Sequence, residues 1–394
     1  MKSSVFTYFL SLILGTTLAH GAVIMVNNGQ SIQNAVNAAS SGDEIFLPGG
    51  VFLEDVVVNG KKLSLRSFGT TTEVRSISFI NAPGRSTIQN LRLSDLNTTN
   101  SDLFVKKATI SNNVHILGGK FQILQSIITE KLTCKTSVSH ILYNEIRYAE
   151  IEGNSSITGN HFNGREFIGI GIDINGPQTF AEIRNNRIHD YHTMSSIDLN
   201  DSLIGIRVRN NARANIINNL IYDCFDDHSS GNENSVGMGV YVESSPQTNI
   251  IGNILYGCWV RSGTGSNPGH RFIWAPASGT ITEYNLFWRS NHHQPYDFVG
   301  GGVVANNCIQ TTDPKLNTNG TLKTSSPAIN AGPPDPRFND LDGSRNDIGM
   351  FGGHNFIPDG KTTNKPIVLG LDVAPTFVPV GGSVTIESTG ATVK

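Results

Sequence analysis

The apolar and polar residues between positions 171 and 258 alternate in a pattern that recurs three times. Each copy begins with a glycine, at Gly171, Gly205 and Gly239, so successive copies lie 34 residues apart. Within a copy, one alternating strand is followed by a short spacer and by a second strand that contains asparagine. Alternation with a period of two is typical of β-strands, and a fixed repeat of this length is typical of stacked solenoid repeats. The pattern therefore predicts an all-β solenoid.

Short strand-like runs of the same kind continue on the N-terminal side, between Arg75 and Phe162. Asparagine stands beside apolar residues at several places along the chain: Asn90, Asn160, Asn186, Asn219, Asn253, Asn285 and Asn307. Asparagine tolerates the left-handed backbone conformation of a sharp bend, and its side chain can bond the equivalent asparagine of the next repeat. We therefore expect stacked asparagines along one edge of the solenoid.

The first residues of the chain resemble a targeting signal. Lys2 precedes the apolar run from Val5 to Leu18, and small residues follow between positions 19 and 22. A basic start, a short apolar run and small residues at a cleavage site are typical of secretory signal peptides. The run is too short to span a bilayer comfortably. Residues 1–21 are therefore predicted to be a signal peptide, and the mature protein is expected to be extracellular or periplasmic.

A short amphipathic helix is predicted next, with Ser31 as its N-cap. Its apolar face contains, at helical spacing, Ile32, Ala35, Val36 and Ala39. A solenoid exposes the edge of its terminal repeat, and a helix laid across that end shields the edge. We expect this helix to cap a solenoid that extends over residues 22–360.

The segments Ser31–Ala39 and Gly42–Phe52, followed by Asn-Asn-x-Ile repeats, resemble right-handed parallel β-helix proteins of the pectate-lyase-like superfamily. The segments Ser326–Gly332 and Asp340–Gly353 are similar to the closing segment of many secreted β-helix proteins. The resemblance implies an all-β, right-handed parallel β-helix solenoid with a short N-terminal capping helix. It implies no particular activity, because this fold hosts lyases, hydrolases, epimerases and adhesins.

The catalytic motifs of two enzyme families with this fold do not occur in the chain. The separated Asn-Thr-Asp, Asp-Asp, His-Gly and Arg-x-Lys set of polygalacturonase-type hydrolases is not present, and neither is the pectate-lyase Asp-His strand motif with its Arg-Pro sequence. No catalytic residue can therefore be transferred from either family.

Charge and composition narrow the range of partners. The 394 residues have a net charge of −3 and contain no basic block, which gives no support to a nucleic-acid partner. After the signal peptide, no apolar segment approaches the length of a membrane span. The composition changes in residues 361–394, where Pro366–Leu371 and Pro379–Ile386 look like strands. This region is expected to be a C-terminal β tail or the start of an incomplete further domain.

Insertions in the repeats predict where a ligand binds. A turn of such a solenoid needs about twenty residues, so a 34-residue repeat contains extra residues, which all fall before the next glycine-led strand. The insertions are His189–Ser202, Asp223–Gly237, Gly257–Gly269 and Arg289–Gly302. Loops that leave one corner on successive turns lie side by side and commonly form a binding wall. We expect a groove between this wall and the glycine-led strands.

The outward positions of the glycine-led strands predict a grid of six exposed side chains. Asp173, Arg207 and Tyr241 form one column, and Asn175, Arg209 and Glu243 form the other. In one interpretation the grid is a solvated sheet face with ion pairs between turns, such as Asp173 with Arg207 and Arg209 with Glu243. In the other, the two arginines neutralise the carboxylates of an acidic polysaccharide.

The predicted loops add groups that could transfer protons. Elimination from a uronate needs a base and an acid, and His228 or Tyr241 could act in proton transfer. The candidate catalytic residues are Asp173, Arg207, Arg209, Asp227, His228 and Glu243, and the candidate substrate-binding residues are Asn175, Tyr241, His192, His270 and His293. We therefore expect a secreted carbohydrate-active protein that binds, and in one interpretation cleaves, an acidic polysaccharide as a lyase or a hydrolase. The alternative is a non-catalytic extracellular binding or adhesion module.

The sequence indicates no cofactor with certainty, and Ca²⁺ is the one candidate. Asp226 and Asp227 are adjacent and could share a proton or bind a cation, with Asp226 as the possible metal ligand. The segment Asp340–Asp347 has acidic residues at alternate positions but lacks the glutamate of a full Ca²⁺ loop. We predict that this segment is a structural turn held by a carboxylate.

Cysteine and tryptophan leave further alternatives open. Cys224 and Cys258 occupy the same position of successive repeats, and stacked turns lie about 4.8 Å apart, within the range of a disulfide. They form either a disulfide or a stacked pair of thiols. Trp259, Trp274 and Trp288 lie at or beside the predicted loops. Exposed aromatic rings stack on sugars, but a tryptophan can equally cap the core.

Overall fold

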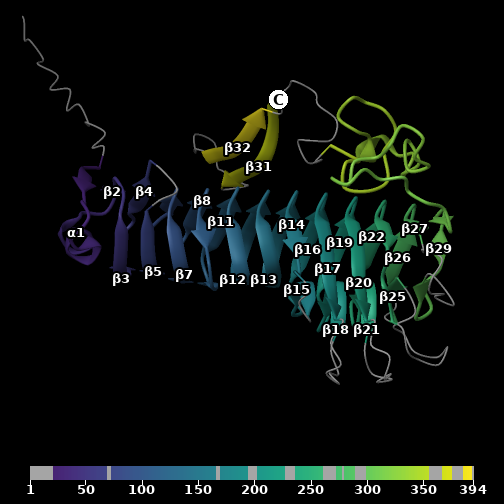
Figure 1. Ribbon diagram of the computed structural model, residues 1–394, viewed down its shortest axis with the longest axis horizontal. Helices are drawn as coiled ribbons and strands as arrows, with labels where there is room; N and C mark the ends of the chain where they lie inside the picture. Colours follow the sequence, from purple (N-terminus) through teal and green to yellow (C-terminus); the bar gives the residue numbers. More distant parts are fainter. Residues whose placement is uncertain are drawn as a thin grey trace, which may run out of the picture.

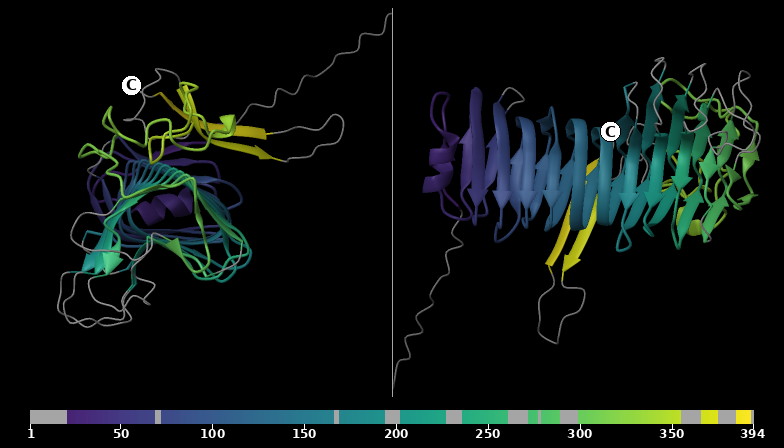
Figure 2. Two further views of the ribbon diagram at one scale, coloured as in Figure 1. Left: turned by 90° about the vertical axis from the view of Figure 1, so that its right-hand side faces the viewer. Right: turned by 90° about the horizontal axis from the view of Figure 1, so that it is seen from below.

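The computed structural model of the protein describes residues 21–68, 72–165, 169–193, 202–226, 236–260, 272–276, 279–288, 299–354, 366–374 and 385–392. Strands β1 to β30 are joined by parallel pairing into one long solenoid (Figure 1). Seen along the axis, the turns superimpose around a common core (Figure 2). The predicted all-β parallel β-helix is confirmed. In the part of the chain that the structure describes, no helix is long and apolar enough to cross a membrane.

Three parallel sheets run along the solenoid, and each turn adds a strand to each of them. Sheet 1 contains β10 (Val114–Leu117), β15 (Ile170–Asn175), β18 (Ser202–Arg209), β21 (Val236–Val242), β25 (Ile273–Trp274) and β28 (Val299–Gly300). Sheet 2 contains β1 (Val23–Met25), β2 (Glu44–Leu47), β4 (Ser64–Ser67), β6 (Ser86–Gln89), β8 (Leu103–Lys106), β11 (Lys120–Leu124), β16 (Phe180–Arg184), β19 (Arg213–Ile217), β22 (Thr248–Ile251), β26 (Thr280–Glu283) and β29 (Ala305–Asn306).

Sheet 3 contains β9 (Thr109–Ile110), β14 (His161–Asn163), β17 (Arg187–Thr193), β20 (Leu220–Asp226), β23 (Ile254–Tyr256), β24 (Trp259–Val260), β27 (Leu286–Trp288) and β30 (Ile309–Gln310). Five longer strands bend and contribute to more than one sheet: β3 (Val51–Asn59), β5 (Glu73–Ile80), β7 (Arg92–Thr99), β12 (Ile127–Leu142) and β13 (Glu145–Thr158).

Helix α1 (Ile32–Ala38) covers the N-terminal end of the solenoid, as predicted (Figure 1). The Ser31 hydroxyl accepts a hydrogen bond from the Asn34 amide and donates one to Glu54 of β3. The Glu54 carboxylate also accepts the amide hydrogens of Ile32 and Gln33. The first turn of the helix is therefore capped both by its own serine and by the solenoid that it covers.

The asparagine-containing stretch of each repeat is two strands instead of the single strand that was predicted. A left-handed residue, such as Asn185 (φ 54°) or Asn218 (φ 53°), separates the sheet 2 strand from the sheet 3 strand. The next residue, Asn186 or Asn219, is buried. Asparagine adopts the left-handed conformation more readily than most residues, which is why it marks this corner.

The predicted asparagine stack is confirmed at this corner. Its members are Asn144, Asn160, Asn186, Asn219, Asn253 and Asn285, and each amide group donates to the side-chain oxygen of the next at 2.9–3.0 Å. The spacing along the chain grows from 16 to 26 residues and then to 33 and 34, and the last step is 32 residues. Asn90 bonds the Ser67 carbonyl instead, and Cys308 rather than Asn307 lies next to Asn285.

The glycine at the start of each 34-residue copy permits close packing of sheet 1 on sheet 3. A Cβ atom on Gly205 would lie 2.7 Å from both the Gly239 carbonyl oxygen and a methyl carbon of Ile221 in β20. Gly171 has the same 2.7 Å approach to the Gly205 oxygen. The 34-residue glycine repeat therefore reflects a steric requirement at the same place of each turn.

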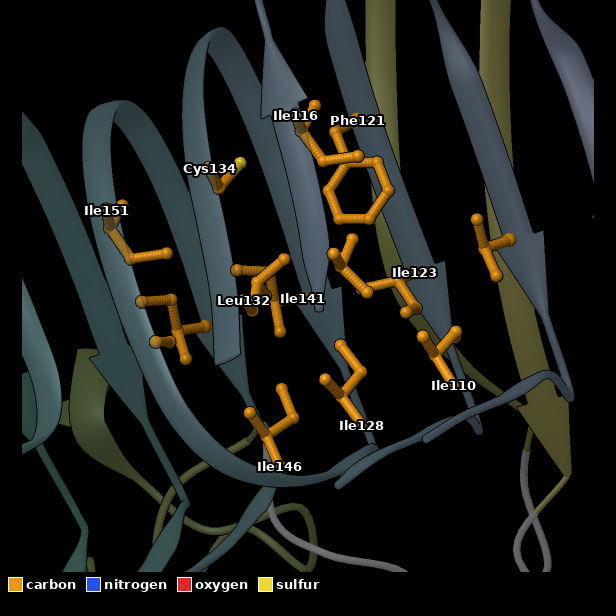
Figure 3. Packing of buried hydrophobic residues seen from close by; sticks show 14 of the residues in the cluster. Ile110, Ile116, Phe121, Ile123, Ile128, Leu132, Cys134, Ile141, Ile146 and Ile151 are labelled. Carbon is orange, nitrogen blue, oxygen red and sulfur yellow. The ribbon is translucent and has the colours of Figure 1, made fainter. Parts of the chain in front are cut away.

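Inside the turns, aliphatic side chains from all three sheets stack into a continuous core. Figure 3 shows this packing, for example Ile123 and Ile141 with Leu132. Cys134 lies in the same core, and burial raises the pKa of its thiol to about 11. Alternating inward positions from every turn thus supply the main stabilisation of the solenoid.

Cys224 and Cys258 are free, buried thiols and do not form a disulfide. Each sulfur faces the backbone carbonyl two residues before it, that of Tyr222 at 3.6 Å and that of Tyr256 at 3.4 Å. Burial, with the neighbouring Cys258 thiol, raises the pKa of Cys224 well above its ordinary value. The repeat position was therefore predicted correctly, and of the two alternatives the thiol pair is present.

We expect the Cys224 thiol to be unreactive toward an aromatic disulfide reagent at pH 8 in the native protein, because a buried thiol with a raised pKa forms little thiolate. All four cysteines are expected to react once the protein is unfolded without reductant. Mass spectrometry of the labelled peptides measures this. If only two of the four cysteines were labelled in the unfolded protein, Cys224 and Cys258 would not be a pair of free thiols.

The closing segment folds back over the outer face of sheet 3. Ala328, Ile348, Met350 and Phe351 form a second apolar cluster with Leu220, Tyr222, Ile254 and Leu286 of sheet 3. The Asn185 side chain donates to the carbonyls of Met350 (3.0 Å) and Gly352 (2.7 Å). Asp340 accepts the amide hydrogens of Asp347 and Gly353, so the predicted carboxylate-held turn is present.

Short elements complete the chain. A 3₁₀ helix, η2 (Pro336–Phe338), lies in the closing segment. Strand β31 (Pro366–Ala374) pairs with β32 (Thr385–Thr392) as a separate two-stranded antiparallel sheet. Strand β31 contains the first predicted C-terminal strand, and β32 contains the end of the second from Thr385 onward, whereas residues 379–384 lie outside the described residues.

Candidate functional site

The predicted grid lies on the outer face of sheet 1, with the register that the repeat implied. Asp173 of β15 pairs with Arg207 of β18, and Arg207 pairs with Tyr241 of β21. Asn175 pairs with Arg209 in the same way. The alternate residues of these strands point into the core, so the grid residues share the outer face.

Asp173, at the end of its column of the grid, is fully buried, whereas an exposed side chain was predicted. Its carboxylate accepts two hydrogen bonds from the Arg207 guanidinium, at 3.1 and 2.8 Å, and further bonds from Arg209 at 2.9–3.1 Å. The expected Arg207 pair is confirmed. The expected pair of Arg209 with Glu243 is wrong, because Arg209 turns to Asp173 while Glu243 stays exposed.

The two arginines keep Asp173 ionised. Burial alone raises the pKa of this carboxyl, but hydrogen bonds and charge from Arg207 and Arg209 outweigh burial and hold the pKa below its ordinary value. The same contact raises the pKa of Arg209. At neutral pH Asp173 is therefore a fixed anion and not a proton donor.

The charged face continues onto earlier turns, in residues that the sequence analysis did not single out. Lys131 lies 2.7 Å from Glu150, and Lys135 lies 2.8 Å from Glu152. The Asn175 side chain donates a hydrogen bond to Glu152 at 3.1 Å and so connects the grid to the ion pairs of the earlier turns. The turns that carry these lysines and glutamates are shorter than 34 residues. The 34-residue repeat therefore does not predict that they continue the charged face.

An aromatic surface adjoins the arginines on the other side. Tyr241 is half-buried, and the next strand places Trp274 in register beside it. Burial and the nearby Glu243 raise the pKa of Tyr241, so its phenol stays protonated at neutral pH and can donate a hydrogen bond. The outer face of sheet 1 thus combines a guanidinium pair with two aromatic side chains.

Most of the catalytic and substrate-binding residues that were predicted in the loops belong to segments outside the described part of the chain. Asp227, His228, His270 and His293 lie outside the described residues. The backbone of Asp226 ends β20, but its side chain is outside the described part as well.

His192 belongs to β17 of sheet 3 instead of a loop, and its ring stacks on Phe225 of β20 with centroids 4.5 Å apart. The first residues of two predicted insertions, His189–Thr193 and Asp223–Asp226, therefore continue as strand. The structure does not bring His192 to the grid.

Among the residues that the structure describes, no group of three or more His, Cys, Asp or Glu side chains is placed to hold a metal ion. The carboxylates around the grid are instead engaged with cations of the protein itself, Asp173 with Arg207 and Arg209, and Glu152 with Lys135. The side chain of the predicted Ca²⁺ ligand Asp226 is not among these described groups.

No protein-family model and no curated protein sequence matches this chain.

Proposed function

We propose that this protein binds an acidic polysaccharide on the outer face of sheet 1. The observation that carries the proposal is the pair of guanidinium groups that Asp173 holds side by side at the surface. The Arg207 and Arg209 side chains remain 22% and 26% exposed although both are bonded to the same carboxylate. Two guanidinium groups and one carboxylate give these three residues a net charge of +1, and Glu150 and Glu243 lie near Arg209.

The guanidinium pair is suited to a carboxylate or sulfate. Each guanidinium has five N–H donors, and Asp173 occupies only those on one edge of each group. The remaining donors can form the paired, charge-assisted bonds with which arginine recognises planar anions. Because Asp173 already orders both side chains, binding loses less conformational entropy. Tyr241 and Trp274 offer aromatic surface for an adjacent sugar ring.

The described groups support binding more than cleavage. Glycosidic cleavage needs a carboxyl or another acid that can donate a proton, and elimination needs a base. Asp173 is held ionised between its arginines, and Tyr241 keeps its proton. We infer a binding protein, exported by a signal peptide over residues 1–21. We also infer kinship with the pectate-lyase-like superfamily, from the motifs at Ser31–Phe52 and Ser326–Gly353.

Binding is tested by titrating the protein with pectin, alginate, a glycosaminoglycan and neutral starch, using calorimetry. We expect binding to an acidic polymer and none to starch. Replacing both arginines by lysine (Arg207→Lys with Arg209→Lys) keeps the charge but removes the paired donors, and affinity is expected to fall about tenfold. Arg75→Lys, at an exposed pair with Asp55, is the matched control.

Two results would contradict the proposal. One is the absence of binding to every acidic polymer, and the other is unchanged affinity in the double lysine variant. Each titration is also read at the absorbance of unsaturated uronates and assayed for reducing ends, with and without Ca²⁺. Products in either assay would show that the protein cleaves the polymer, as a lyase or a hydrolase, and does not only bind it.

A further inference from the structure

A second row of aromatic side chains follows the outer face of sheet 3. Successive strands β14, β17, β20, β23 and β27 place one ring each in this row: His161, His189, Tyr222, Tyr256 and Trp288. The first three steps have centroid separations of 4.8, 4.6 and 4.8 Å and interplanar angles of at most 20°. In this part the rings cover one another and present only their edges.

The row is interrupted at Trp288. Its ring centroid lies 5.7 Å from that of Tyr256, and the two ring planes are tilted by 54°. The following strand, β30, continues the pairing with Ile309 beside Leu286 and Gln310 beside Phe287, and it brings no further ring to the row. Both Tyr256 and Trp288 are only half-buried. The end of the row therefore offers aromatic faces that its earlier members do not.

A cavity of about 530 Å³ lies between this end of the row and the segment that follows β30. Arg187, Tyr222, Tyr256 and Trp288 line it from sheet 3, and residues 313–318 with Lys323 line it from the opposite side. This volume is in the range of small-ligand sites. The cavity lies on sheet 3 and shares no lining residue with the grid on sheet 1.

The charge of the cavity wall is positive. Arg187 donates to the Tyr222 hydroxyl through Nε at 2.8 Å, and it has no carboxylate partner in the described part of the chain. Lys315 and Lys323 are exposed and likewise form no ion pair with a described residue. Asp313 is the single acidic residue of the lining. Three cations around one carboxylate favour an anionic ligand.

Polar groups in the lining suit a ligand with hydroxyl groups. The Tyr256 hydroxyl has no hydrogen-bond partner among the described residues, and Asn317 and Thr318 complete the wall. The Asp313 carboxylate accepts hydrogen bonds, so it fits the hydroxyl donors of a sugar and repels a bare phosphate or sulfate. An aromatic face together with donors and acceptors is typical of sites for sugar rings.

We propose that this cavity is a second carbohydrate site, which binds an oligosaccharide that carries carboxylate or sulfate groups. A sugar ring packs on the tilted face of Trp288, and its anionic substituent lies among Arg187, Lys315 and Lys323. The site goes beyond the binding proposed for sheet 1, because different residues on a different sheet carry it.

The test is a titration of the intrinsic tryptophan fluorescence with four probes: a uronate oligosaccharide, a sulfated oligosaccharide, a neutral oligosaccharide of equal length, and sodium sulfate. We expect one of the two acidic oligosaccharides to change the emission, and no response to the neutral oligosaccharide or to sodium sulfate. In Lys315→Gln with Lys323→Gln the Kd is expected to rise about tenfold, since two charge contacts are lost. Both lysines are exposed, so this variant should keep the melting temperature of the native protein.

Two further variants separate this site from the others. All fluorescence titrations use the Trp274→Phe background, because Trp274 lies on the sheet 1 face and would report binding there. In this background Trp288→Phe is expected to abolish the emission change while calorimetry still detects binding. The double variant Arg213→Gln with Lys107→Gln is the charge-matched control, because both residues are exposed and lie outside the cavity lining. Arg207→Lys with Arg209→Lys is expected to leave the fluorescence response unchanged.

The proposal is overturned if neither acidic oligosaccharide changes the emission, if sodium sulfate alone reproduces the change, or if the Lys315 and Lys323 variant binds like the control. It is also overturned if the response is lost in the Arg207 and Arg209 variant, because sheet 1 would then account for all binding. Loss of the response only in the Lys315 and Lys323 variant supports the cavity, whatever the outcome for sheet 1.

Discussion

Replacing Asp173 by alanine is expected to lower the free energy of unfolding by about 3–5 kcal/mol, the range for breaking one side of a buried ion pair. The carboxylate is fully buried and bonds two guanidinium groups. Without it, Arg207 and Arg209 lie side by side as like charges with their inner donors unpaired. Urea unfolding followed by circular dichroism measures the change.

The control for this prediction is Asp55→Ala. Asp55 also accepts two bonds from one arginine, Arg75, at 2.8 and 2.6 Å, but both side chains are more than half exposed. Exposed pairs contribute little to stability, so the unfolding midpoint should stay unchanged within error. Equal effects of the two substitutions would contradict the view that Asp173 organises the arginine pair.

The same carboxylate predicts how stability depends on pH. The pKa of Asp173 is lower in the folded protein than in the unfolded chain. Its contribution is therefore fully present above the unfolded value of about 3.9, and it is lost as the pH falls through the folded pKa. Wild-type protein and Asp173→Ala are expected to converge in stability in acid. A gap that stays constant down to the acid limit would argue against this linkage.

Asn219→Ala is expected to lower the free energy of unfolding by about 3 kcal/mol or more, because several buried polar groups lose their partners at once. The Asn219 side-chain oxygen accepts from the amide and the side chain of Asn186, both at 3.0 Å. Its amide group donates to Asn253 and to the Ile183 carbonyl, both at 2.9 Å. Thermal and urea unfolding measure the loss.

Asn249→Ala provides the comparison for Asn219→Ala. Asn249 is half-buried in β22 and makes one side-chain bond, to Asn215 at 2.7 Å. Water can replace that bond, so the expected cost is below about 1 kcal/mol. If Asn219→Ala were no more damaging than Asn249→Ala, the asparagine stack would not be the structural corner that we infer.

Both proposed sites depend on the same property of the solenoid. Equivalent positions of successive turns lie in register, as Asp173 and Arg207 do on sheet 1, and Tyr222 and Tyr256 do on sheet 3. A row of side chains on such a scaffold is ordered by neighbours above and below it. Ordering before binding is what reduces the entropic cost of recognition.

The repeat was sufficient to predict much of the fold and part of the sheet 1 face. Alternation identified inward and outward positions, and the 34-residue spacing placed Asp173 beside Arg207 and Arg207 beside Tyr241. Ser31 and the apolar spacing after it predicted α1. These features are local or strictly periodic, so each can be recognised without knowledge of the rest of the chain.

Tertiary structure alone decided which contacts these positions make. Arg209 could reach either Asp173 or Glu243, and it bonds the one that the fold buries, where a charge needs partners most. The asparagine stretch is two strands with a corner between them instead of one strand, because one left-handed residue in each turn, such as Asn185 or Asn218, turns the chain there.

The sequence pattern likewise did not predict the cavity on sheet 3. Lys315 and Lys323 line it together with Trp288 only because the chain after β30 folds back over sheet 3. No periodicity relates that segment to the strands it covers. Packing of its apolar side chains on sheet 3, and not a local pattern, determines where it lies.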